Sequence, residues 1–176
     1  MLFTPLEIPG AFLVDIEPKT DDRGFFARSY CKKEFEAHGL GTRLSQCNIS
    51  YSEAVGTLRG MHIQLAPYQE AKLVRCTRGS LYDVMVDLRR DSPTYCKWFG
   101  VTLTAASRQA VYVPEGCAHG FQTLEPASEA FYQVSEYYSK EFERGYRWND
   151  PAFGIVWPLP DPVLSPRDRA HADYIR

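Results

Sequence analysis

The chain has 176 residues, 44% hydrophobic and 24% charged, with a formal net charge of −2 at pH 7. This length fits one domain with a sizeable core, so we predict a single domain over residues 1–176. The balanced charge argues against nucleic acid or anionic membrane as a partner. No apolar run is long enough to span a membrane, and no secretion signal is visible at the N-terminus. We therefore expect a cytoplasmic protein.

Short apolar or alternating segments recur along the chain between turn residues. They are AFLVDIEP (11–18), LVRCT (73–77), SLYDVMVDL (80–88), KWFGVTL (97–103), QAVYVP (109–114) and EAFYQVSEYY (129–138). Many short strands at this spacing predict an all-β sandwich or barrel. Two other segments, 31–40 (CKKEFEAHGL) and 139–146 (SKEFERGY), are the best candidates for short peripheral helices.

The Arg-Gly-Ser sequence at 78–80 separates two of these strand candidates, and we predict a β-hairpin there. In the second strand, the even-numbered residues from Tyr82 to Leu88 share one face, whereas Asp83, Met85 and Asp87 share the other. The mixed second face predicts that part of it lines a wet cavity or the surface and not a dry core.

The cysteines follow no pairing or ligand pattern. They are Cys31, Cys47, Cys76, Cys96 and Cys117. The odd number, the wide spacing and the absence of a C-x-x-C pair argue against both a disulfide framework and a zinc site. We expect reduced thiols.

His62, in TLRGMHIQ (57–64), is a lone histidine in a strand-like run. A metal site in a small β-barrel usually needs two closely spaced histidines, a carboxylate and a later histidine. Gln64 stands where the second histidine would be, and His119 is the only later candidate in the chemistry-bearing stretches. Two histidines without a nearby acid make a poor ligand set, so we expect no metal.

A second interpretation makes His62 a base, since an imidazole near pKa 6.5 moves protons at neutral pH. Lys72 could stabilise an enolate oxygen, and Tyr132 could deliver a proton from the opposite side. The alternative is structural: His62 at a strand edge, Lys72 as a solvated charge and Tyr132 in the core. The spacing of these residues leaves both interpretations open.

Four longer stretches resemble one known family. They are RGMHIQ (59–64), PYQEAKLVRCTRGSLYDVMVDLRRDSPTY (67–95), VPEGCAHGF (113–121) and WNDPAFGIVWP (148–158). They look like the nucleotide-sugar 3,5-epimerases of the dTDP-4-dehydrorhamnose 3,5-epimerase family, over nearly the whole chain. The resemblance implies a cupin-type jelly roll, no metal, no cofactor, and a homodimer whose subunits exchange N-terminal segments.

The resemblance also implies roles for individual residues. His62 would be the base, Asp168 in LSPRD would orient it, Lys72 would stabilise the enolate and Tyr132 would be the acid. The implied contacts with the nucleotide-diphosphate sugar are Arg23, Gln46, Asn48, Arg59, His119, Tyr138 and Glu143. Arg59 and His119 match positions that hold the diphosphate and the sugar. Arg23 would reach the pocket of the partner subunit.

Two positions depart from the family pattern: Arg28 replaces an acidic residue in RGFFARS, and Cys47 replaces the aspartate of a Q-D-N motif. The nucleotide carrier is therefore open between dTDP, CDP and GDP, and inversion at C3 alone is an alternative to inversion at C3 and C5. Two other classes compete with the epimerase, a non-catalytic sugar-nucleotide-binding cupin and a metal-dependent cupin oxygenase.

Overall fold

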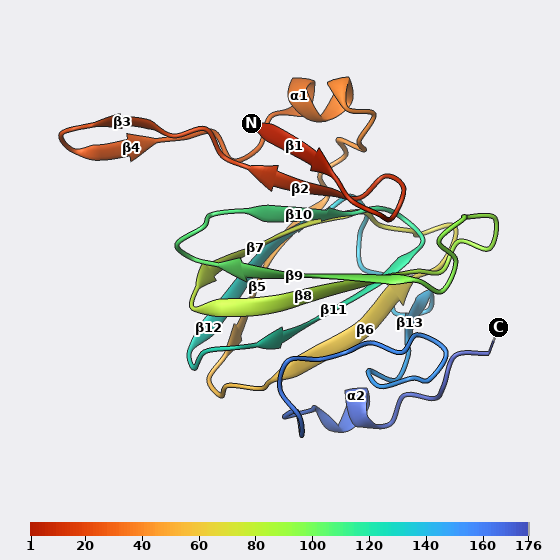
Figure 1. The fold of residues 1–176 in the computed structure, drawn as a ribbon. Helices are drawn as coiled ribbons and strands as arrows, with labels where there is room; N and C mark the ends of the chain where they lie inside the picture. The colour runs from red at the N-terminus through yellow and green to blue at the C-terminus, as the bar shows by residue number, and fades with distance from the viewer. Residues whose placement is uncertain (176) are drawn as a thin grey trace.

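Two antiparallel β-sheets packed face to face form most of the computed structural model, which describes residues 1–175 (Figure 1). In spatial order, the first sheet contains β1 (Leu2–Pro5), β2 (Phe12–Asp15), β10 (Ala110–Val113), β7 (Lys72–Arg78), β12 (Ser128–Val134) and β5 (Gln46–Ser52). The second contains β13 (Glu143–Gly145), β6 (Leu58–Gln64), β11 (Cys117–Thr123), β8 (Ser80–Asp87) and β9 (Trp98–Thr104). Every segment predicted as a strand contains one.

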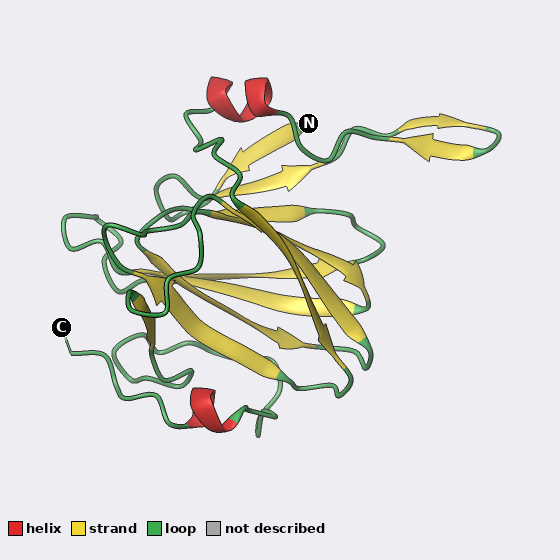
Figure 2. Cartoon of the chain, turned by 180° about the vertical axis from the view of Figure 1, so that it is seen from behind, coloured by secondary structure: helices red, strands yellow, loops and turns green. Residues whose placement is uncertain are grey.

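Outside the sandwich lie a hairpin of β3 (Lys19–Asp21) and β4 (Gly24–Phe26), and the short helices α1 (Lys32–Ala37) and α2 (Pro166–Arg169). Seen from behind, the helices lie at opposite ends of the sandwich and the β3–β4 hairpin projects away from it (Figure 2). The predicted all-β, cupin-type sandwich with peripheral helices is confirmed. None of the helices over residues 1–175 has the length and apolar character of a membrane span.

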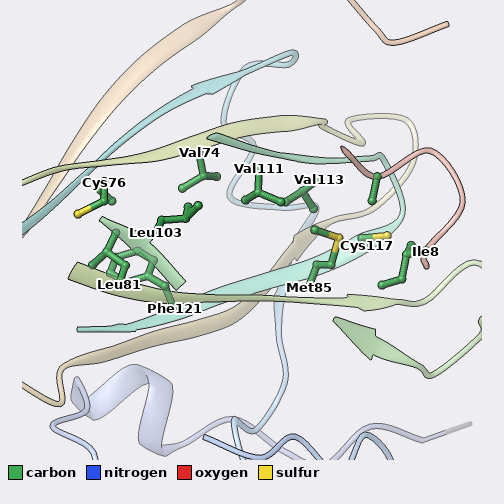
Figure 3. Packing of buried hydrophobic residues seen from close by; sticks show 12 residues of the cluster. Ile8, Val74, Cys76, Leu81, Met85, Leu103, Val111, Val113, Cys117 and Phe121 are labelled. Atoms are coloured by element: carbon green, nitrogen blue, oxygen red, sulfur yellow. The ribbon is translucent and has the colours of Figure 1, made fainter. Parts of the chain in front are cut away.

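The main core fills the space between the two sheets (Figure 3). Val74 and Val111 from the first sheet meet Met85 and Leu103 from the second, and all four side chains are buried. Burial of each such side chain contributes about 1.5–3 kcal/mol to folding. Met85 thus shows that the mixed face of β8 is the face turned toward the other sheet.

The predicted hairpin at residues 78–80 is wrong. β7 and β8 belong to different sheets, and Ser80 pairs with Thr104 of β9. Gly79 makes the crossing possible: it has φ +72°, and a Cβ there would lie 2.3 Å from Ser128 Oγ. Both strands turn apolar residues toward the same core, so the chain folds across the layers and not within one.

The helix predicted over 31–40 is confirmed as α1, whereas the one predicted over 139–146 is wrong. The backbone carbonyl of Ser139 accepts hydrogen bonds from the N–H groups of Phe142 and Glu143, which form a turn. β13 (Glu143–Gly145) follows this turn and pairs with β6. Pairing with a buried strand outweighs the weak local helix propensity of this segment. All five cysteines are free thiols, as expected.

Asp87, at the end of β8, is fully buried and anchors the loop that follows. Its carboxylate accepts hydrogen bonds from Arg89 Nε and Nη2, both at 2.8 Å, and from Thr94 Oγ1 at 2.7 Å. Burial acts to raise the pKa of Asp87, but these bonds and those from Ser92 outweigh it and lower the pKa to about 2.

Replacing Asp87 by asparagine is expected to lower the free energy of unfolding at pH 7 by about 2 kcal/mol. A depressed carboxyl pKa stabilises the fold above the unfolded-state value near 4, and this contribution is lost as the pH falls toward 2. Urea unfolding at pH 7, 5 and 3 should therefore show a gap between wild type and Asp87→Asn that narrows at pH 3. The exposed Asp91→Asn, four residues on, is the matched control. A gap that stayed constant with pH would contradict this account.

Candidate active site

Two adjoining hollows of about 280 and 190 Å³ lie at one open end of the sandwich, between the sheets. His62, Lys72 and Tyr132 line both of them. The first hollow also contains Gln46, Asn48, Tyr138 and Glu143, and the second contains Arg59, His119 and Asp168. The fold therefore gathers every predicted site residue except Arg23 into one cleft.

Strand register explains this convergence. His62 on β6 lies directly opposite His119 on β11, so the two imidazoles enter the cleft side by side. Asn48 on β5 lies opposite Tyr132 on β12. Gln46 shares the face of Asn48, because residues two apart in a strand point the same way. The two sheets thus present these groups to one space.

Gly60 explains the Arg-Gly pair before His62. A Cβ at Gly60 would lie 2.6 Å from the Cα of Gly120, and Gly60 has φ +138°, a value that side chains rarely allow. The glycine lets β6 and β11 approach closely at this point. This close approach brings the side chains of His62 and His119 next to each other.

The His62 ring is held by a carboxylate from far along the chain. Its Nε2 lies 2.6 Å from Asp168 Oδ1, although the two residues are 106 positions apart. Because an ionised carboxylate only accepts, Nε2 carries the hydrogen and the lone pair of Nδ1 is left as the basic position. The pairing predicted for these two residues is therefore present.

Asp168 is held in place by α2, a helix that was not predicted from the sequence. Ser165 caps this helix: its Oγ accepts the Asp168 N–H at 3.0 Å and donates to Asp168 Oδ2 at 2.9 Å. Burial acts to raise the pKa of Asp168, but the hydrogen bond from His62, its charge and the Ser165 hydroxyl together lower it. The S-x-x-D pattern at 165–168 was the available signal, a capping box.

Lys72 is not a solvated charge. Its Nζ lies 2.9 Å from Glu70 Oε1, and both side chains are only 11% exposed. Glu70 lines the first hollow and was missed by sequence reasoning. The signal was its position two residues before Lys72, on the same side of an extended chain. The Glu70 carboxylate therefore holds the end of the Lys72 side chain in the cleft.

His119 also has a carboxylate partner. Its Nε2 lies 3.0 and 2.9 Å from the two oxygens of Asp83, which is buried on β8. The expectation that the histidines lack a nearby acid is therefore wrong, since both acids come from distant parts of the chain. Asp83, on the mixed face of β8, thus holds a histidine that lines the second hollow, but no residue of β8 itself lines either hollow.

Arg59 places a guanidinium in the second hollow. The Tyr51 carbonyl accepts from its Nη2 at 3.0 Å, and Ser52 Oγ accepts from its Nε at 3.3 Å. These contacts aim the side chain without neutralising it. The second hollow thus combines a cation and an imidazole, groups that bind phosphate oxygens.

Gln64 has a structural role where a metal site would need a histidine. Its buried amide donates to the carbonyls of Tyr68 and Tyr137 at 2.9 and 3.2 Å, and its oxygen accepts the Ser139 N–H. Gln64 therefore holds the loop that carries Tyr138 into the first hollow.

Tyr138 and Glu143 interact with each other at the rim. Glu143 Oε2 accepts from the Tyr138 hydroxyl at 2.7 Å and pairs with Arg167 Nη2 at 2.6 Å. Burial acts to raise the pKa of Glu143, but the bonds from Arg167 and Tyr138 outweigh it and lower the pKa. The same bond to Glu143 raises the pKa of Tyr138. Arg167, next to Asp168, links the rim to α2.

Arg23 is not in this cleft. It lies at the tip of the projecting β3–β4 hairpin, where it pairs with Asp21, and its side chain is 90% exposed (Figure 1). Phe25 and Phe26 on the same hairpin are also exposed. An exposed arm of this kind, with two aromatic side chains, is suited to contact another chain.

The two departures noted in the sequence also lie away from the cleft of this chain. Cys47 is exposed on β5 between Gln46 and Asn48, so its side chain points to the opposite face. Arg28 pairs with Glu34 of α1 at 3.1 Å.

The fold and the cleft define a class: a cupin-like isomerase whose histidine–aspartate pair, lysine and tyrosine surround one small, polar binding site. Comparisons narrow the class. The family model for dTDP-4-dehydrorhamnose 3,5-epimerase matches residues 5–174. The chain therefore belongs to the dTDP-4-dehydrorhamnose 3,5-epimerase family.

Individual relatives agree. The Pseudomonas aeruginosa dTDP-4-dehydrorhamnose 3,5-epimerase is 44% identical over 171 residues, 96% of this chain and 93% of that one. A Streptomyces niveus dTDP-4-dehydrorhamnose 3-epimerase is 42% identical over 96% of this chain and 82% of its own length. The crystal structure of the Bacillus anthracis 3,5-epimerase with TDP and PPi bound has a TM-score of 0.94 and 42% identity, covering 98% of this chain and 99% of that chain.

Replacing Gln64 by methionine is expected to lower the free energy of unfolding by about 2–3 kcal/mol, because it removes three partly buried hydrogen bonds to the backbone of Tyr68, Tyr137 and Ser139. Amide hydrogen exchange at residues 137–139 should accelerate in Gln64→Met. The control is Gln69→Met, at an exposed position. Equal stability and unchanged exchange in the two variants would show that Gln64 does not hold this loop.

Proposed function

We propose that this nucleotide-sugar epimerase inverts C3 and C5 of a dTDP-linked 4-keto-6-deoxy sugar, by proton removal and return through an enolate. The observation that carries the proposal is the 2.6 Å contact between His62 and Asp168 at the wall of a cleft shared by Lys72 and Tyr132. No step requires a metal or an organic cofactor.

Proton removal begins at His62. The C4 ketone acidifies the C–H bonds at C3 and C5, and the Nδ1 lone pair of His62 accepts one such proton. The ring then becomes an imidazolium, which the Asp168 carboxylate stabilises through Nε2–H. The low pKa of Asp168 keeps the carboxylate charged at neutral pH. Asp168 therefore orients the base and offsets its charge.

Lys72 stabilises the negative charge on the enolate oxygen. Its buried ammonium, held by Glu70, donates to the oxygen on which negative charge develops. One well-placed donor of this kind contributes about 3–4 kcal/mol to transition-state stabilisation. Glu70 holds the ammonium within the cleft and is a positioning residue.

Inversion requires that the proton return from the other face. Tyr132, on the opposite sheet from His62, would give its phenolic proton to the carbon. The enzyme is then left with an imidazolium and a phenolate, and proton exchange with solvent restores both. Base and acid on opposite walls of one cleft are the arrangement that an inversion needs.

The second hollow suits the diphosphate, because Arg59 and His119 converge there. In the first hollow, Gln46, Asn48 and Tyr138 supply polar and aromatic contacts for the rest of the substrate. A dTDP carrier is favoured over CDP or GDP by the family and by the TDP bound to the Bacillus anthracis relative. Inversion at C3 alone is the second candidate, favoured by the 42% identity to the Streptomyces niveus 3-epimerase.

The β3–β4 hairpin supports a homodimer in which each arm completes the partner's site. The hairpin projects from the sandwich (Figure 2), and its Arg23, Phe25 and Phe26 are exposed, which supports contact with a second copy. We also propose that the protein is a homodimer, that residues 1–176 form a single domain, and that the protein is cytoplasmic.

The reaction can be tested by incubating the protein with dTDP-, CDP- and GDP-linked 4-keto-6-deoxyglucose in D2O. NMR should show deuterium entering at C3 and C5, fastest with the dTDP sugar. His62→Ala should slow exchange by about 10²–10⁴-fold, and Tyr132→Phe should keep some exchange but impair inversion. His38→Asn, at an exposed helix end, is the control. No exchange with any carrier would refute the epimerase proposal, and exchange at C3 alone would select the second candidate.

Mixed dimers of two inactive variants test whether the β3–β4 hairpin completes the active site of the partner subunit. Arg23→Ala and His62→Ala should each be nearly inactive, but mixing them by unfolding and refolding should restore about a quarter of the wild-type rate. Half of the dimers are then mixed, and each mixed dimer has one site with an intact His62 and an intact Arg23 from the partner. A mixture with no gain in activity would show that the arm does not complete the partner's site.

A further inference from the structure

His171 brings a second imidazole to Asp168. Its Nε2 lies 3.4 Å from Asp168 Oδ1, the same oxygen that His62 contacts at 2.6 Å. The two imidazole rings meet edge to face, with centroids 5.8 Å apart. One nitrogen of each histidine and one carboxylate oxygen of Asp168 all lie within 4.8 Å of one another.

The fold builds His171 into this position. The side chain is 13% exposed and packs against β13 at Gly145, where a Cβ would lie 2.1 Å from two atoms of the imidazole ring. Only glycine leaves room for the ring. The Nε2 atom is buried and makes no hydrogen bond to any of residues 1–175. A fixed, buried nitrogen without a hydrogen bond is costly, and the proposed reaction does not use it.

The three donors match the preferences of a transition metal. Two imidazole nitrogens and one carboxylate oxygen form a recurring Zn²⁺ ligand set, with a fourth position left for water. Ligand atoms about 2.0–2.2 Å from zinc stand roughly 3.4 Å apart in a tetrahedral shell. Metal binding therefore has to lengthen the His62–Asp168 separation of 2.6 Å by roughly 0.8 Å and to shorten the widest separation, at most 4.8 Å, by up to about 1.4 Å, while the His171–Asp168 separation of 3.4 Å already fits. The His62 ring is 30% exposed at the cleft wall.

We propose that His62, Asp168 and His171 form a Zn²⁺ site that inhibits the enzyme. Zinc bonded to Nε2 of His62 displaces the hydrogen that Nε2 gives to Asp168, and this hydrogen moves to Nδ1. The lone pair that accepts the substrate proton is then gone, so the base is switched off reversibly and no atom is lost. Binding depends on the three ligands alone, whereas inhibition rests on the proposed function of His62 as the base.

Co²⁺, which replaces Zn²⁺ in such sites and absorbs visible light, provides the direct test. Metal-free wild-type protein and His38→Asn should each bind one Co²⁺ per chain, with absorption bands that one equivalent of Zn²⁺ removes. His171→Asn should bind at least 10-fold more weakly. If His171→Asn does not fold, Asp168→Asn serves the same purpose. No bound Co²⁺ in wild type, or equal affinity in the ligand variant, would overturn the site.

Inhibition is measured separately, by the D2O exchange assay with added ZnCl2 and with EDTA to reverse it. Wild type and His38→Asn should lose exchange at the zinc concentration that fills the site. His171→Asn, compared with its own metal-free rate, should need at least 10-fold more zinc. Full exchange by zinc-loaded wild type would overturn the inhibitory role. Absence of exchange without metal would instead refute the proposed function, and the Co²⁺ result would still decide the site.

Discussion

The hydrogen bond between His62 and Asp168 is the interaction on which the site depends, because it joins strand β6 to a segment from the end of the chain. On the side of Asp168, one short helix and its cap hold the carboxylate. The position of the His62 ring therefore depends on the packing of residues 146–175 against the outer face of the second sheet.

Aromatic burial secures that docking. Phe153, Trp157 and Tyr174 pack with Val84 and Val86, whose side chains cover the outer face of β8. The even-numbered face of β8 is thus buried under the C-terminal segment, while the odd-numbered face points to the core between the sheets. Backbone hydrogen bonds between Tyr146 and Met61, and a β-bridge between Thr57 and Val163, fix the position of this segment along β6. This packing offsets the entropy lost in ordering a long segment with little regular structure.

Three nitrogen groups of the cleft each contact a carboxylate: His62 contacts Asp168, His119 contacts Asp83, and Lys72 contacts Glu70. Each buried carboxylate fixes the direction of a group that has to meet the substrate. Arg59 is held by neutral acceptors and keeps its charge for an anion. Orientation by a buried partner costs nothing at the moment of reaction, which is the advantage of a preorganised site.

How much of this was predictable differs between elements. The alternation in the strands sufficed for the all-β class. The family resemblance named eleven site residues, and ten of them line the two hollows. The turn at Gly79 was misread because local sequence does not say which sheet a strand joins. Residues 139–146 were misread because β6 offered an unpaired edge that the local pattern cannot reveal. Asp83, Glu70 and His171 were missed as site residues because their importance arises from contacts made across the fold.

The central claim is that Asp168 fixes the hydrogen of neutral His62 on Nε2 and leaves Nδ1 as the base. The most direct measurement is ¹⁵N NMR of the histidine side chains in metal-free protein above neutral pH, with His62 assigned by comparison with His62→Ala. The account predicts a protonated Nε2 and an unprotonated Nδ1 in wild type, and loss of this preference in Asp168→Asn. A hydrogen on Nδ1 of wild-type His62, or the same tautomer with and without the Asp168 carboxylate, would contradict it.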